Sequence, residues 1–218
     1  MILKEIYVYP DLVEFPQELT SSFRDYSRHI CNYLERALRL IKFETKGYYK
    51  LAVIGCSDIA PRAFVNSSGA LGVKVSFKSE QYLNIPIERV PDYISDMLRS
   101  GINACPDEYP LPKEQLLAAL DELRGAGFKN GWVHKEKKSA KLDMLAQLYC
   151  SMTMQNFSLE IRVYQKGKMI CQKELLRTVP DEIVFLPKLR EYKTLKLSDE
   201  YAEVHGPESS ILARVSFG

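Results

Sequence analysis

The sequence has 218 residues, of which 46% are hydrophobic and 27% charged, and a formal net charge of +2. This composition is that of an ordinary globular protein and excludes disordered, collagen-like and coiled-coil chains. The small net charge argues against a dedicated nucleic-acid binder. No uncharged apolar run approaches the roughly 20 residues that span a bilayer, so no membrane insertion is expected. One domain over residues 1–218 is predicted, with two small domains as the alternative.

The cysteines point to a cytoplasmic protein. There are five of them, widely spaced and without a C-x-x-C pair. An odd number of separated cysteines suits reduced thiols better than a disulfide framework. The first residues also lack the basic stretch and apolar core of a secretory signal.

The N-terminal part is predicted to pair a strand with a long helix. Residues 2–9 are rich in β-branched and aromatic residues, which favours a strand. Apolar residues then recur every three or four positions from Leu19 to Ile41, which predicts a helix capped near Ser22 and closed by Gly47. The opposite face is basic, as in a solvated helix face. Its charged residues are Arg24, Arg28, Glu35, Arg36, Arg39 and Lys42.

Two strands and two shorter helices follow. Residues 49–54 form a continuous apolar run and residues 71–77 alternate between apolar and polar, so both are predicted strands. Pro91 opens the first of the shorter helices and Gly101 is predicted to end it. A second helix is expected from residue 112 to residue 125 by the same signals.

The charges are segregated along the chain. Residues 80–122 contain nine acidic side chains against three basic ones, whereas residues 123–177 contain eleven basic against four acidic. Such asymmetry can produce oppositely charged surfaces for a partner, or it can cancel through pairing inside the fold. Asp92, Asp96 and Asp121 are therefore predicted to bind a protein partner.

The clearest pattern lies between Met144 and Val179. Apolar and polar residues alternate over 144–154 and 157–164, a glycine-containing turn follows, and a third, less regular strand runs to Val179. This predicts an antiparallel meander, and residues 194–197 and 211–217 predict two further strands. The expected fold class is α+β, a largely antiparallel sheet with a C-terminal β-meander, covered by one long and two shorter helices.

The stretch from Arg124 to Lys141 is predicted to be a basic loop. It holds three glycines, the only tryptophan and several lysines. These residue types suit an anion or nucleic-acid contact, or a flexible connection that Trp132 anchors to the core. If the loop instead docks a protein partner, Trp132, His134 and Lys135 are the candidate binding residues.

An enzymatic alternative would use Cys56. This cysteine directly follows an apolar strand, as a nucleophile of a hydrolase or transferase could. The chain has no nucleophile-elbow glycines, no phosphate-binding or dinucleotide-binding glycine motif and no zinc-protease motif. The sequence therefore favours a non-catalytic protein, and no catalytic residue, metal site or cofactor is predicted.

The segment Lys129 to Lys135 is the nearest thing to a motif. In general character, as a compact mixed α/β chain with separated charge and no targeting signal, the sequence is similar to the small cytoplasmic immunity proteins with which bacteria neutralise toxins. The resemblance implies a protein partner, such as a toxin encoded nearby, whose active site is occluded. Immunity proteins share no single fold, so the resemblance implies no particular binding residue.

Overall fold

The structure is a computed structural model and describes residues 1–217. It confirms the α+β class and the predominance of antiparallel pairing, because six of the eight strand pairings within these residues are antiparallel. The internal contacts divide the chain into two compact units, Met1–Lys129 and Asn130–Gly218. A single domain over residues 1–218, in the sense of one cooperative folding unit, stays a prediction.

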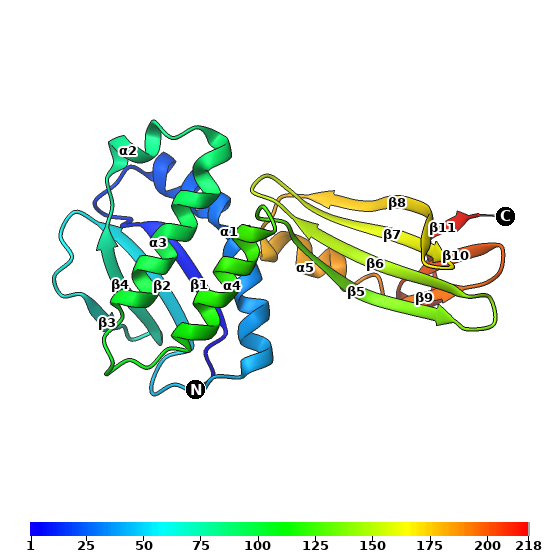
Figure 1. Cartoon of the computed structure of the whole chain (residues 1–218), viewed down its shortest axis with the longest axis horizontal. Helices are drawn as coiled ribbons and strands as arrows, with labels where there is room; N and C mark the ends of the chain where they lie inside the picture. The colour runs from blue at the N-terminus through cyan, green and yellow to red at the C-terminus, as the bar shows by residue number, and fades with distance from the viewer. Residues whose placement is uncertain (218) are drawn as a thin grey trace. The chain divides into compact units, whose positions relative to one another are not determined.

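The N-terminal unit is built on a sheet whose strand order is β1-β2-β4-β3 (Figure 1). The strands β1 (Glu5–Pro10), β2 (Lys50–Cys56) and β4 (Ala70–Ser76) are parallel, and only the short β3 (Ala63–Val65) runs antiparallel to β4. The short β3 therefore lies within the segment that connects β2 to β4.

The helix α1 (Gln17–Ile41) connects β1 to β2. It begins directly after Pro16, so the predicted cap at Ser22 is wrong, and it ends at Lys42, whose φ of 52° lies in the left-handed region, rather than at Gly47. The predicted apolar stripe is buried at Phe23 and Ile30, but Leu40 is exposed at the end of the helix, where Leu34 and Leu38 are buried instead.

The basic face predicted for α1 is not solvated throughout. Arg28 and Glu35 are buried and form an ion pair at 3.3 Å. Ile6 donates its N–H to Glu35 (3.0 Å) and accepts from Arg28 (3.1 Å) through its carbonyl. Both polar groups of Ile6 lie on the free edge of β1 and need partners. The buried pair therefore closes that edge.

Further helices cover one side of this sheet. After α2 (Ser79–Leu83) and the short η1 (Ile87–Arg89), α3 (Val90–Ala104) packs on β2 and β4, and α4 (Lys113–Gly125) packs on α1 and α3. The prediction that α3 ends at Gly101 is wrong. Gly101 lies inside the helix, which continues to Ala104. A Cβ at this position would come within 2.5 Å of the Val53 side chain. The glycine thus serves close helix–strand packing.

The C-terminal unit confirms the meander and extends it. β6 (Met144–Met152), β7 (Phe157–Gln165) and β8 (Lys168–Thr178) pair in order, and β5 (Asn130–Ser139) precedes them. The predicted loop from Arg124 to Lys141 is therefore wrong: most of it is β5. A β-bulge between Val133 and Lys135 interrupts the alternation that would have identified this strand.

A small second layer buries the inner face of the meander. It consists of α5 (Glu182–Leu189) and a sheet of order β11-β10-β9, made of β9 (Thr194–Leu197), β10 (Tyr201–His205) and β11 (Ile211–Ser216), with the short η2 (Pro207–Ser209) before β11. Phe185 of α5 stacks on Phe157 at a ring-centroid distance of 4.1 Å. Neither α5 nor β10 is predicted from the sequence. Within residues 1–217, no helix combines the length and apolar composition needed to cross a membrane.

Candidate functional site

The three predicted acidic residues lie on α3 and α4, where arginines pair with them. Arg124 contacts both Asp92 (3.4 Å) and Asp96, and Arg99 contacts Asp121. The hydrogen bond to Asp96 raises the pKa of the Arg124 guanidinium. Because Arg124 belongs to the basic segment of the sequence, part of the charge asymmetry cancels locally, between neighbouring helices.

The other predicted partner-binding residues, Trp132, His134 and Lys135, are on β5. Trp132 is partly buried, with its ring 6.0 Å from that of Phe157, which is the position of a core anchor. His134 occupies the bulge, and burial, with a smaller effect of Lys135, lowers its pKa, so its ring is neutral at pH 7. These residues belong to the C-terminal unit and the aspartates to the N-terminal unit. The structure therefore brings each set together within its own unit.

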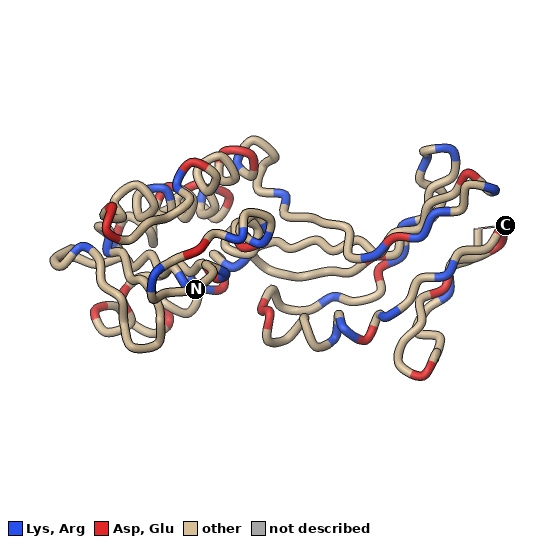
Figure 2. Tube along the Cα trace, turned by 90° about the horizontal axis from the view of Figure 1, so that it is seen from below, with Lys and Arg blue, Asp and Glu red and all other residues tan. Residues whose placement is uncertain are grey.

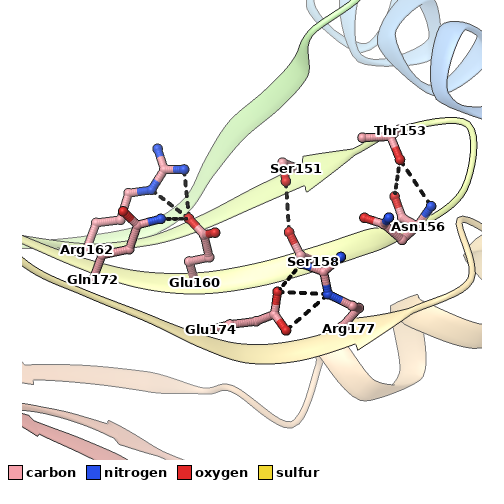
Figure 3. A network of polar contacts seen from close by, with 9 residues as sticks. All are labelled: Ser151, Thr153, Asn156, Ser158, Glu160, Arg162, Gln172, Glu174 and Arg177. Atoms are coloured by element: carbon pink, nitrogen blue, oxygen red, sulfur yellow. Dashed lines mark hydrogen bonds and ion pairs between the residues drawn. The ribbon is translucent and has the colours of Figure 1, made fainter.

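The outer face of the meander carries a polar network (Figure 3). Glu160 accepts hydrogen bonds from Arg162 (2.7 Å) and from Gln172 (2.9 Å), and the Arg162 guanidinium lies 3.7 Å from the centroid of the Tyr149 ring. The Tyr149 ring also covers Gly131, where a Cβ would clash with it. An antiparallel sheet commonly leaves one polar face to water. A face whose polar groups satisfy one another in this way fits that ordinary role.

The geometry of Cys56 opposes the enzymatic alternative. Its side chain ends β2 and is 3% exposed. Burial, and secondarily Asp11, raise the pKa of the thiol to about 11. A nucleophilic cysteine needs a lowered pKa and an accessible sulfur, because the thiolate is the reactive form. Cys56 has the opposite environment, that of a core side chain.

The parallel sheet of the N-terminal unit has one face that none of the helices within residues 1–217 covers. α3 packs on the face that carries Val53 and Gly55, and α1 closes the free edge of β1. The residues that alternate with these point to the other side, among them Tyr7 and Tyr9. Parallel sheets almost always have both faces covered. A face of such a sheet without a helix on it is therefore unusual.

Side chains of the sheet itself lie across this face. The ring of Phe64 lies directly over Gly72. A Cβ at that glycine would come within 2.7 Å of the ring. Tyr9 and Phe64 pack against the buried core of Ala52, Ile54 and Cys56. Small residues in the middle of β2 and β4 thus let the rings lie close to the strands.

Cations flank the rings. Lys50 and Arg28 lie 4.8 and 4.7 Å from the centroid of the Tyr7 ring, and Lys74 lies beside Ile54 in the strand register. Burial raises the pKa of Tyr7 and of Tyr9, so both keep their hydroxyl protons near neutral pH. We call this surface the aromatic face. It consists of Tyr7, Tyr9, Lys50, Phe64 and Lys74.

Sequence reasoning missed the aromatic face, although one signal for it was present. Alternate residues of the first strand are aromatic, whereas those between them are aliphatic, so both sides of that strand are suited to contact. The pattern does not say which side the helices cover.

No protein-family model, no curated protein and no solved structure matches this chain.

Proposed function

We propose that this protein is a non-catalytic binding protein and that its aromatic face docks a protein partner. The observation that carries the proposal is the uncovered face of a parallel sheet, a surface that is normally buried. A partner that packs on β1, β2 and β4 would supply the missing layer.

The composition of the face favours a protein over a nucleic acid. Tyrosine and phenylalanine rings over an apolar floor resemble the centre of protein interfaces, where aromatic residues are enriched. The rings are already held against the strands, so binding would immobilise few additional rotamers. In the N-terminal unit as a whole, 16 basic residues are balanced by 17 acidic ones, which opposes a phosphate-driven interaction.

The partner class follows the resemblance to immunity proteins. Such a protein would act in the bacterial cytoplasm and occlude the active site of a toxin encoded nearby. The five free cysteines, four of them buried, suit a reducing compartment. The paired aspartates of α3 and α4 would then contribute at most to the rim, where charges mainly affect the association rate.

The test is a calorimetric titration against the purified products of neighbouring genes, followed by rescue from their toxicity. We expect a stoichiometric complex that Lys74→Glu or Tyr9→Ala weakens at least about tenfold, corresponding to about 1.4 kcal/mol. Thermal melts check that each variant is folded.

A further variant serves as the control. Glu80→Lys, an exposed charge reversal on α2, should leave the affinity unchanged. Unchanged binding by both aromatic-face variants would reject this face. If charge reversal at Asp92, Asp96 and Asp121, or at Lys135, abolished binding instead, those residues would be assigned as the binding site.

A further inference from the structure

A groove of about 410 Å³ opens at the carboxyl end of β4, between the connection that follows β2 and one side of α3. Its volume is within the range of small-molecule sites, roughly 300–1,000 Å³. Ligands of open α/β sheets bind outside the carboxyl ends of the strands, which is where this groove lies. Its polar lining consists of Arg62, Ser76, Lys78, Gln81, Tyr93, Asp96 and Ser100.

The groove carries uncompensated positive charge. Arg62 comes from the connection before β3 and Lys78 from the segment before α2, and both are exposed. Within residues 1–217, neither of them makes an ion pair with an acidic side chain. Asp96 also lines the groove, but Arg124 already pairs with it. Two cations from separate segments therefore face one concave surface.

Tyr93 supplies a hydrogen-bond donor between the cations and the apolar wall. Its side chain lines the groove, where the hydroxyl proton can be donated to a ligand. Burial raises the pKa of Tyr93, so this proton is present at neutral pH. Val75 and Met97, both buried, form the apolar side of the groove.

We propose that this groove binds a small organic oxyanion, a carboxylate or phosphate attached to a short apolar body. Arg62 and Lys78 hold the anionic group, the Tyr93 hydroxyl donates a hydrogen bond to it, and the apolar body rests on Val75 and Met97. Guanidinium and ammonium groups make charge-assisted hydrogen bonds to such groups, which are about twice as strong as neutral ones. The proposal is independent of whether the aromatic face docks a protein.

The test uses three probes that separate the two parts of the ligand. Phenyl phosphate has the oxyanion and the apolar body, inorganic phosphate has only the former, and benzyl alcohol has the body without charge. Amide chemical shifts of Ser76, Lys78 and Ser100 are followed in titrations at constant ionic strength. We expect saturable shifts with phenyl phosphate, at least about tenfold weaker binding of inorganic phosphate, and no saturation with benzyl alcohol.

Variants assign the shifts to the groove. Arg62→Ala and Lys78→Ala should each weaken phenyl phosphate binding about tenfold, and Tyr93→Phe about threefold, whereas Lys168→Ala in the C-terminal unit should change nothing. Both cations are exposed, so the variants should fold, and Arg62→Gln provides a second substitution. The proposal is overturned if the three amides show no saturable shift, or if their shifts saturate equally in the Arg62 and Lys78 variants.

Discussion

His29 shows how burial of a single residue makes stability depend on pH. It lies on α1, is 2% exposed and donates from Nδ1 to the carbonyl of Tyr26 (2.8 Å). Burial lowers its pKa to about 4, only partly opposed by this hydrogen bond, whereas an unfolded histidine titrates near 6.5. Between these pH values the unfolded chain binds a proton that the folded chain does not. The free energy of unfolding therefore decreases as the pH falls through this window.

We predict that His29→Asn, which keeps a donor but does not titrate, removes this contribution. Between pH 7.5 and pH 4.5, the wild type should lose about 2 to 3 kcal/mol more unfolding free energy than the variant. Urea unfolding at the two pH values, followed by circular dichroism, measures the difference. Equal losses in both proteins would mean that His29 is not held neutral in the fold.

Among the elements, the helix α1 has two structural roles, and the periodicity of its sequence reveals only the first of them. Its apolar stripe fills the core, and the buried Arg28–Glu35 pair closes the free edge of β1, helped by Ser27, which donates to the carbonyl of Val8 (3.2 Å). Unpaired edges invite intermolecular strand pairing, so this arrangement also protects the sheet. Removal of either partner would take the ion pair away from a charge that stays buried, which is costly.

We predict that Glu35→Gln lowers the unfolding free energy by about 3 kcal/mol, since it removes the buried ion pair with Arg28. Arg39→Ala, at an exposed position of the same helix, should change it by less than about 0.5 kcal/mol. Urea unfolding compares the two variants. A loss below about 1 kcal/mol for Glu35→Gln would show that the pair does not close the edge as described.

Sequence periodicity predicts some of the helices and strands but not others. The long helix, the meander and β9 follow from their regular patterns, because burial of one face imposes the period. β5 escapes detection because of its bulge, and α5 because it is short and contains Pro187. Parallel pairing of β1, β2 and β4 could not be predicted, since alternation identifies the faces of a strand but not its neighbours.

The candidate site illustrates the same limit. The charges of Asp92 and Asp96 were visible in the sequence, but their shared partner Arg124 lies on another helix. The aromatic face depends on the side of the sheet that α3 occupies, which is decided by packing at Gly55 and Gly101. Local patterns contain no such information about tertiary contacts.

At the scale of the whole molecule, each unit has a buried core of its own. We predict that the two units unfold separately, contrary to the single domain expected from the sequence. Trp132, the only tryptophan, reports on the C-terminal unit, whereas most helical residues lie in the N-terminal unit. Urea unfolding curves from tryptophan fluorescence and from circular dichroism at 222 nm should therefore have different midpoints.

Coincident midpoints and slopes would instead establish one cooperative domain. Trp132→Phe provides the control, because it should abolish the tryptophan signal and leave the transition of the N-terminal unit in place.

Acidic and basic residues are interspersed along the trace of each unit (Figure 2). The Asn130–Gly218 unit has 14 basic residues against 11 acidic ones, and the Met1–Lys129 unit is nearly neutral. Specific contacts on the aromatic face, rather than long-range attraction, should therefore dominate partner affinity.

The most direct measurement is hydroxyl-radical footprinting of side chains in the free protein and in its complex with the partner from a neighbouring gene. We predict that Tyr7, Tyr9 and Phe64 lose reactivity in the complex, because the partner covers the aromatic face, whereas Trp132 and Tyr149 keep their reactivity. Unchanged reactivity of Tyr9 and Phe64 in a saturated complex, with protection at Trp132 instead, would contradict the claim that the uncovered face of the parallel sheet is the binding surface.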